Sequence, residues 1–569
     1  MKLYFTAAAK INPEHSVLFN QMAINIQKIF TELMDSVSRQ NKDSIDWWVS
    51  SPASRNTLSS PLFHYCCCIA LLQELIRAKK PITEIVTDSK AFKRIIEDYL
   101  IKQKVNAEVT RIRLSPKQRL KGLVWPIYTI FGLPLKQVLF FFVAKSTRSS
   151  RKPIPADPLI LIDTFVMNGF IEKDRYYPGL KEALSEEEKK AVWFVPQFYG
   201  FHTWQYLSVL KRMRKADRNF ILKDEFLKFV DYWCLWQHLF RVRKLTLNSS
   251  FLYGVDISPL VREELTDFHR AGSSYAPLLN YCFTKRLKKA GVKLRLIIDW
   301  FENQNIDRGW NAGFRCFFPD VETIGYQGFI ESTHYLCMYP TEEEKNNRVI
   351  PQKMAVIGKG LVKPARRFCS DLDVFIAPAF RFQHVLQERK YFPAENLYTI
   401  LVALPIMISE AVNILKLLAH EADEGIDDFH FWIKPHPTAS QLMIKTAFGD
   451  EWPEQFRFVA GDFNDCLEKS NLLISSASST CMETLAKGIP VIVVGNNSGL
   501  TRNPIPEIIT EDIWSLCHTR DEITEALQFY KRRNKEKIKE HEIAGRRIRE
   551  EYFEPVTPEA VRNFLGFNK

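Results

Sequence analysis

Two strand-to-helix junctions near the C-terminus constrain the fold of this 569-residue chain more than any other feature. The apolar run 429–433 leads into Lys-Pro-His-Pro at 434–437, and the apolar run 472–474 leads into Ser-Ser-Ala-Ser-Ser-Thr at 475–480. Another apolar run, 490–494, follows after one short helical stretch. Strands that alternate with helices in this way form parallel sheets covered by helices. The sequence therefore predicts an α/β domain in this region.

The polar residues at both junctions are of the kinds that bind a nucleotide. Lys434 and His436 place a cation and an imidazole beyond the carboxyl end of a strand, where open parallel sheets bind ligands. A helix N-terminus presents free N–H groups and the positive end of its dipole, so the Ser-rich turn suits a phosphate. We expect the two junctions on neighbouring strands that face one cleft. The hydroxyl groups expected to hold the phosphate belong to Ser475, Ser476, Ser478, Ser479 and Thr480.

A simpler interpretation of each junction stays open. Thr480 and Glu483 have the spacing of a capping box, which marks the start of a helix without any ligand. The Lys-Pro-His-Pro run is also typical of a rigid turn with a solvated Lys434. The nucleotide site is favoured only because both junctions fall in one βαβ succession.

The chain is too long for a single hydrophobic core, so we predict two large domains with connecting elements. The fold class is α/β, with two Rossmann-like, doubly wound parallel sheets that face an interdomain cleft. The first domain begins with a β-α-β-α-β pattern whose strands we place at 46–49, 84–87 and 107–114. The predicted parts are an N-terminal domain at 1–380, a linker at 381–397, a C-terminal domain at 398–520 and terminal helices at 521–569.

A basic and apolar insertion interrupts the N-terminal domain at about 115–150. Residues 111–152 contain ten Lys and Arg and no acidic residue, whereas the whole chain has 78 basic and 66 acidic residues. The apolar stretch inside it is broken by Pro126, Gly132 and Pro134, which argues against a spanning helix. Apolar aromatics flanked by cations suit an anionic membrane surface, and a core helical hairpin is the alternative. Nucleic acid is a poor partner, because the aromatic residues are not interleaved with the charges.

Cysteine usage and the N-terminus indicate the compartment. Eleven cysteines form no C-x-x-C pair, so we expect reduced thiols, no disulfide and no structural zinc. The apolar run before Lys10 is too short for the hydrophobic region of a signal peptide. We therefore expect a cytoplasmic protein, peripheral at the inner face of the cytoplasmic membrane.

Two Rossmann-like halves with a Ser-rich turn in the second resemble the GT-B glycosyltransferases. More narrowly, KPHP followed by SSASST resembles motifs of bacterial sialyl-, polysialyl- and Kdo-transferases, which use CMP-activated sugars, and of CDP-glycerol glycerophosphotransferases. The strings IIDWFENQ and IGYQGF resemble bacterial surface-carbohydrate biosynthesis proteins, including those of lipopolysaccharide and capsule. The resemblance covers residues 157–494. It implies a nucleotide-sugar donor as substrate, with no separate cofactor.

The resemblance also implies roles for individual residues. Lys434 and His436, in the motif that Pro437 completes, would contact the donor phosphate or base, and the serines would cradle the phosphate. Glu483 would meet a ribose hydroxyl if it is not committed to the cap. Polysialyltransferases carry an acid-acid-Gly motif. The only similar string in this sequence is at 423–425, at the end of a predicted helix, and we interpret it as structural. The catalytic base is therefore not assigned by motif.

Glycosyl transfer needs a carboxylate on the acceptor side and donors for the departing phosphate. Our candidates for the carboxylate are Glu302, Asp163 and Glu225, in that order, because each lies near the end of a predicted strand. Arg55 follows the first predicted strand and is a candidate contact for an anionic substrate, with a helix cap as the alternative. No D-x-D motif indicates a divalent metal.

The first functional hypothesis is a metal-independent, membrane-associated GT-B transferase that adds a sugar, Kdo or sialic acid-like, to a lipid-linked or surface glycan. The alternatives are a CDP-glycerol-type glycerophosphotransferase or a nucleotide-sugar epimerase of the same architecture. A third hypothesis is a non-catalytic subunit of a surface-glycan assembly complex.

Overall fold

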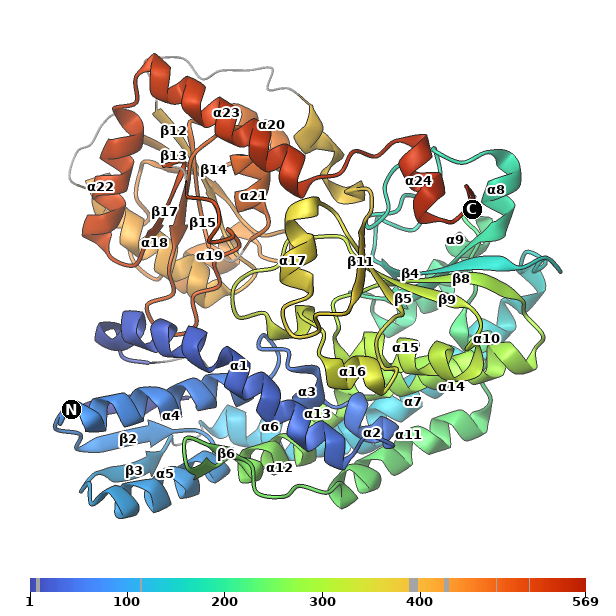
Figure 1. Cartoon of the computed structure of the whole chain (residues 1–569), viewed down its shortest axis with the longest axis horizontal. Helices are drawn as coiled ribbons and strands as arrows, with labels where there is room; N and C mark the ends of the chain where they lie inside the picture. The colour runs from blue at the N-terminus through green and yellow to red at the C-terminus, as the bar shows by residue number, and fades with distance from the viewer. Residues whose placement is uncertain are drawn as a thin grey trace.

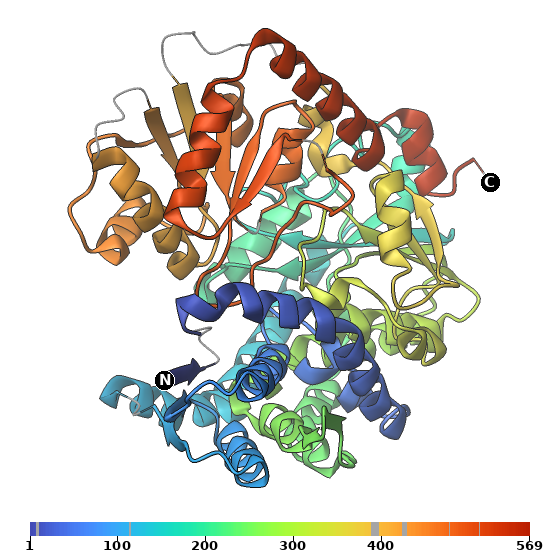
Figure 2. The same cartoon turned by 60° about the vertical axis from the view of Figure 1, so that its left-hand side comes forward.

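The computed structural model describes residues 1–6, 11–112, 115–387, 398–423, 429–476, 478–510 and 512–568, without the side chains of 116–119, 269 and 420–423. It contains a small three-stranded sheet and two six-stranded sheets, all parallel (Figures 1 and 2). The expected α/β class with two doubly wound sheets is confirmed by the strand orders given below. Residues 388–397 of the expected linker, and Gly425 of the acid-acid-Gly string, lie outside the described residues.

The first part of the chain forms its own sheet, in the order β1-β2-β3, and does not join the larger one. Its strands and main helices are β1 (Lys2–Phe5), β2 (Glu84–Thr87), β3 (Glu108–Arg111), α1 (Ser16–Gln40), α4 (Leu62–Arg77) and α5 (Lys90–Gln103). The prediction of a strand at 46–49 is wrong, because Ile45–Trp48 forms the short helix α2. Both tryptophans of α2 are buried, and Trp47 Nε1 donates to Ser38 Oγ at 3.0 Å. A short apolar run does not distinguish a strand from a buried helical turn.

The N-terminal six-stranded sheet has the order β11-β10-β9-β8-β4-β5. Chain order reverses between β4 and β8, which lie side by side, so this sheet has its topological switch point there. The carboxyl ends of both strands therefore border the position at which doubly wound sheets bind ligands. The strands are β4 (Leu159–Val166), β5 (Val192–Phe198), β8 (Leu294–Trp300), β9 (Glu322–Gln327), β10 (Lys353–Val356) and β11 (Asp373–Ile376).

The C-terminal six-stranded sheet has the order β14-β13-β12-β15-β16-β17, with its switch point between β12 and β15. Both predicted junctions follow strands of this sheet, β13 and β15. Helix α18 (Ile408–Asp423) follows β12, and α21 (Thr480–Leu485) follows β15. The strands are β12 (Tyr398–Ala403), β13 (Phe429–Lys434), β14 (Phe456–Phe458), β15 (Leu472–Ser475), β16 (Val491–Val494) and β17 (Trp514–Cys517).

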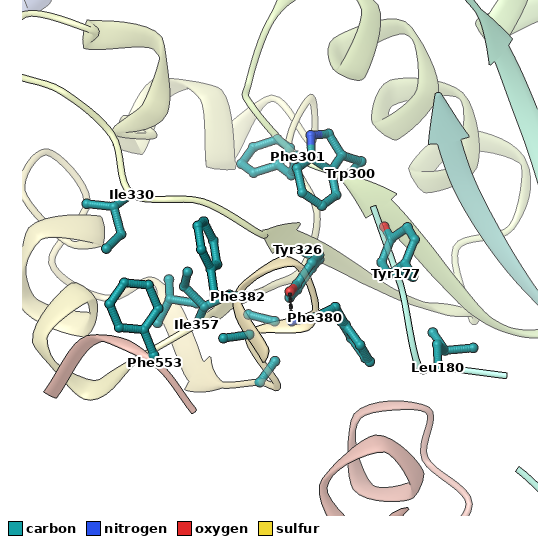
Figure 3. Packing of buried hydrophobic residues seen from close by; sticks show 14 of the residues in the cluster. Tyr177, Leu180, Trp300, Phe301, Tyr326, Ile330, Ile357, Phe380, Phe382 and Phe553 are labelled. Carbon is teal, nitrogen blue, oxygen red and sulfur yellow. Dashed lines mark hydrogen bonds between the residues drawn. The ribbon is translucent and has the colours of Figure 1, made fainter. Parts of the chain in front are cut away.

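The C-terminal helices return the chain to the N-terminal domain. Helix α22 (Arg520–Lys531) is followed by α23 (Lys535–Tyr552), which lies so close to α21 that a Cβ on Gly545 would be 2.5 Å from the backbone nitrogen of Gly488. Beyond α23, Phe553 packs on Phe382, and Phe564 of α24 (Pro558–Phe564) packs on Tyr326. Figure 3 shows Phe553, Phe382 and Tyr326 within this shared core. The two large domains are therefore joined by a common hydrophobic cluster as well as by the linker.

The basic insertion forms one continuous helical rod, α6 (Pro116–Ile127), the π-helical turn η2 (Tyr128–Gly132) and α7 (Leu133–Ser146). Pro134 has no N–H, so the carbonyl groups one helical turn before it lose their normal partner. Trp236 Nε1 donates to the Ile130 carbonyl, and the Tyr275 hydroxyl donates to the Thr129 carbonyl at 3.3 Å. The rod is thereby attached to the N-terminal domain, and it is not the core helical hairpin that was the alternative.

Candidate functional site

Lys434 and Ser475 stand at the same edge of the C-terminal sheet but not on neighbouring strands. Ala403 of β12 pairs with Lys434 on one side, and Ser475 Oγ donates to the Ala403 carbonyl at 2.8 Å on the other. The expectation of neighbouring strands is wrong because β12 lies between β13 and β15. Two inter-strand spacings separate the backbones of Lys434 and Ser475 by about 10 Å. A nucleotide phosphate with its ribose can span that distance.

The imidazole of His436 is held in a defined orientation. Its Nδ1 accepts from the Thr438 backbone N–H at 3.3 Å and lies 2.8 Å from Thr438 Oγ1. Burial, and then the charge of Arg175, lower the pKa of His436. The ring is therefore neutral near pH 7, and a neutral ring that accepts at Nδ1 carries its proton on Nε2. His436 presents a neutral N–H donor, next to Lys434, whose Nζ donates to the Gly461 carbonyl at 2.7 Å.

The serine turn is only partly free to bind a ligand. The Ser475 hydroxyl is committed to Ala403, and Ser478 Oγ accepts from Thr480 Oγ1 at 2.8 Å. The Ser479 hydroxyl donates to Glu483 Oε1 at 3.3 Å. Ser476 is 8% exposed, and its hydroxyl has no hydrogen-bond partner among the described residues. Ser476 is thus the member of the turn whose hydrogen-bonding capacity remains unfilled.

Glu483 neither closes a capping box nor lies free for a ribose. The N-cap of α21 is Ser479, and Thr480 is already the first helical residue. Glu483 Oε2 instead lies 2.8 Å from Nε2 of His384, in the 3₁₀ helix η8 (Phe380–Leu386) that precedes the C-terminal domain. The capping box that was the alternative is therefore absent, and the expected ribose contact would have to displace His384.

Glu302 lies at the first turn after β8, beside the switch point of the N-terminal sheet. Trp300 Nε1 donates to its Oε1 at 2.9 Å, and Gln304 Nε2 donates to its Oε2 at 2.6 Å. The Tyr335 hydroxyl lies 3.3 Å from the same Oε2. Asp307 accepts from the backbone N–H of Glu302 at 2.9 Å and so fixes the turn. Glu302 is half-buried, which leaves its carboxylate both oriented and accessible.

Asp163 stands at the same switch point but deeper, at 2% exposure. Its Oδ1 accepts from Gln197 Nε2 at 2.9 Å, and Gln197 in turn accepts from Lys223 Nζ at 2.7 Å. Burial raises the pKa of Asp163 to about 7, against the opposing effects of Gln197 and Lys223. Burial, and the nearby Asp307 and Asp163, also raise the pKa of Asp299. Asp163 thus belongs to a buried polar network behind Glu302.

Glu225 and Arg55 are both buried in ion pairs, and the partner of Arg55, Glu344, also accepts from Asn303, the residue after Glu302, at 2.8 Å. The Glu225 carboxylate is fully buried, ion-paired to Arg214 and 3.6 Å from Arg151. The guanidinium of Arg55 is also buried, where it donates to the carbonyl of Tyr339 and to Glu344 Oε1, both at 2.9 Å. Both predictions are corrected here, because these charges are used to hold the fold together and have no face toward a ligand.

Three residues that the sequence did not single out, Arg381, Tyr176 and Arg175, lie in this part of the N-terminal half of the chain. The guanidinium of Arg381 lies 5.7 Å from the ring centroid of Trp300 and 5.8 Å from that of Tyr176. Tyr176 stands edge-on to Trp300, with centroids 4.5 Å apart, and its pKa, raised by burial, also responds to Arg381, Glu302 and Arg175. Arg175 in turn acts on His436 across the domain boundary. The charged and aromatic string DRYY at 174–177, which follows β4, was the available signal.

The described residues contain no group of three or more His, Cys, Asp or Glu arranged to hold a metal ion. Lys434, Arg175 and Arg381 are cations of the protein in this region.

No family model matches the sequence, and no curated protein is similar to it in sequence. Solved structures that align with this one include a glycosyltransferase of kitacinnamycin, with 10% sequence identity and a TM-score of 0.40. That alignment covers 69% of this chain and 96% of the kitacinnamycin enzyme. The UDP-GlcNAc 2-epimerase from Neisseria meningitidis, bound to UDP-GlcNAc, has 12% sequence identity and a TM-score of 0.41. The alignment covers 72% of this chain and 99% of the epimerase. The lipopolysaccharide outer core galactosyltransferase WaaB has 11% sequence identity and a TM-score of 0.40. The alignment covers 72% of this chain and 99% of WaaB. Likeness at this level fixes neither activity nor substrate.

Proposed function

We propose that the protein is a glycosyltransferase that moves a sugar from a nucleotide donor to an acceptor hydroxyl. The donor would lie against the C-terminal sheet at the ends of β13 and β15. The acceptor would lie against the N-terminal sheet at the ends of β4 and β8. The observation that carries this proposal is that Glu302 and His436 each stand just beyond the carboxyl end of a strand, at the ligand-binding edge of their own sheets. Arg175 of the N-terminal domain lies near enough for its charge to lower the pKa of His436.

In this proposal each side chain has a separate task. Glu302 accepts the proton of the acceptor hydroxyl, because it is the half-buried carboxylate that Trp300 and Gln304 orient. His436 Nε2–H and the Lys434 ammonium donate to the departing phosphate, where negative charge develops. Arg175 adds a further positive charge from the opposite domain. The leaving group is thus stabilised by protein cations and N–H donors, without a step that calls for a metal ion.

The proposal extends to the identity of the donor and the acceptor. The KPHP and SSASST strings favour a cytidine nucleotide, with a Kdo or sialic acid-like sugar. A lipid-linked or surface glycan is the acceptor that we infer from the same resemblance.

Thermal unfolding with CMP, CDP, UDP and GDP in parallel tests the donor class. A nucleotide at about 100 times its dissociation constant should stabilise the native state by about 2.7 kcal/mol. We expect the largest shift with CMP. A response to UDP or GDP and to neither cytidine nucleotide would remove the cytidine donor from the proposal.

Turnover of the matching nucleotide-sugar with and without acceptor tests the reaction class. The Glu302→Gln variant keeps the hydrogen bond from Trp300 but loses the base, so we expect kcat to fall by a factor on the order of 100 to 10,000. Glu322→Gln, a change of the same kind at the half-buried start of β9, is the matched control. Conversion of the donor sugar in the absence of any acceptor would instead identify an epimerase.

A further inference from the structure

The α6-η2-α7 rod exposes a long apolar face to the surroundings. Within its segment Leu120–Ser146, the most apolar stretch of 18 residues has a mean hydropathy of 1.7, and only 17% of that stretch is buried. The exposed side chains recur at the spacing of one helix face, and all but Leu139 are more than half exposed. These side chains are Leu120, Leu123, Val124, Ile127, Phe131, Leu135, Leu139 and Phe142. An apolar surface of this length is unusual on a soluble monomer and marks an interaction site.

A second helix, distant in sequence, extends this face. On α11 (Phe229–Arg241) the side chains of Phe229, Trp233 and Phe240 are exposed by 62%, 53% and 65%. The ring of Trp236 lies 6.4 Å from that of Phe131 and 5.6 Å from that of Trp233, measured between centroids. Trp236 therefore joins the exposed aromatics of the rod to those of α11, and we call these side chains together the aromatic face.

Cations gather at the end of the aromatic face where α7 finishes and α11 begins. Burial, and then repulsion from Arg148 and Lys228, lower the pKa of Lys145. Arg148, Lys228 and the next residue, Phe229, are all exposed. The acidic residues beside this cluster are buried and already paired, Glu225 with Arg214 and Arg151, and Asp231, which accepts from the Lys228 backbone N–H at 2.7 Å, with Arg286. The outward charge at this end of the face is therefore positive.

Not all cations of the insertion contribute to this charge. Lys145 Nζ donates to the Glu225 carbonyl at 3.0 Å, and Lys152 Nζ donates to the Ala216 carbonyl at 3.0 Å. These two side chains point into the protein. Among the described side chains of the rod and its flanks, Lys121 near the start of the rod and Arg148 and Lys228 near its end are exposed cations.

We propose that the aromatic face of α6, η2, α7 and α11 lies flat on a phospholipid bilayer that contains anionic lipids. The exposed aromatic and aliphatic side chains enter the acyl boundary, and Lys121, Arg148 and Lys228 contact headgroup phosphates. The bilayer is the occupant because the face combines apolar length with outward cations. The cytoplasmic leaflet, which carries the anionic lipids, is the surface with matching charge.

The rod lies on the membrane and does not cross it. Trp236 and Tyr275 bind its central carbonyls, and those partners belong to α11 and α14 (Tyr275–Lys289) of the N-terminal domain. Phe140 near its end stacks on Tyr206 at 3.6 Å between ring centroids. A spanning orientation would draw these packed elements into the hydrocarbon. This membrane surface does not depend on the proposed transferase activity.

Co-sedimentation of the full chain with vesicles of phosphatidylcholine and phosphatidylglycerol tests the proposal. We expect Leu135→Glu on α7 and Trp233→Glu on α11 each to lower the partition coefficient at least tenfold, and added salt to weaken binding. Phe529→Glu, an exposed aromatic of α22 in the C-terminal domain, should leave binding unchanged. Circular dichroism should show all three variants folded, because the replaced side chains face outward.

Several outcomes would overturn the proposal. Wild-type binding by both Leu135→Glu and Trp233→Glu would show that the aromatic face is not the docking surface. Equal binding to vesicles of phosphatidylcholine alone would remove the role of the cations. A dimer in solution that dissociates in Leu135→Glu, with no vesicle binding, would make a second copy of the chain the occupant. Retention of the protein in membranes after an alkaline carbonate wash would show a spanning helix.

Discussion

His384 Nε2 lies 2.8 Å from Glu483 Oε2, and this pair ties η8 to the helix that follows the serine turn. The Glu483 side chain is 10% exposed and that of His384 is 30% exposed, so the hydrogen bond is partly shielded from water. The pair holds α21 in a fixed position relative to the N-terminal core, to which η8 belongs. It therefore positions the proposed donor site without contacting the reacting atoms.

We predict that His384→Ala lowers the free energy of unfolding by about 1 kcal/mol, the usual net value of one hydrogen bond to a charged or polar partner. Denaturant unfolding measures this change. His202→Ala, in which an exposed ring stacked on Trp204 is removed, should change stability by less than about 0.5 kcal/mol. Equal losses in the two variants would mean that the His384–Glu483 pair contributes nothing specific.

Glu225 should behave as a structural residue and not as a catalytic one. Glu225→Gln leaves the nearly buried Arg214 without its counter-charge, so we predict a loss of about 3 kcal/mol in unfolding free energy. Glu187→Gln, which removes an exposed charge from α8 (Glu186–Ala191), is the control and should be nearly neutral. A stable Glu225→Gln variant that has lost turnover would restore Glu225 as a candidate base.

The junctions of the C-terminal sheet were visible in the sequence, because apolar strands that end in Pro, Gly or Ser runs have a strong local pattern. The order of the strands was not visible, and so Lys434 and Ser475 were expected one strand closer than they are. Trp47 and Trp48 gave an apolar run too short to distinguish helix from strand. Glu302 was expected near a strand end and does lie just beyond β8, whereas Asp163 lies within β4, three residues before its end. Their different burial was not readable, because Gln197, Lys223 and Asn280 come from distant elements.

The buried histidine His541 should make stability depend on pH. Burial, and then Arg533 and Lys537, lower its pKa to about 4, whereas an unfolded histidine titrates near 6.5. Between these values the unfolded chain binds a proton that the native state does not, so stability falls as pH falls. We predict that in His541→Gln the unfolding free energy depends less steeply on pH across this window. The slope should fall by up to about 1.4 kcal/mol per pH unit. Urea unfolding at several pH values measures both slopes, and parallel curves for wild type and variant would contradict the prediction.

Binding of CMP to the wild-type chain and to three variants, by titration calorimetry, tests the central claim most directly. Lys434→Ala and His436→Ala should each weaken binding at least tenfold, because each removes a donor to the phosphate. Glu302→Gln should bind CMP as the wild type does, since the proposed base faces the acceptor. Unchanged affinity in His436→Ala and Lys434→Ala would show that the nucleotide does not lie at the ends of β13 and β15, and would contradict the account.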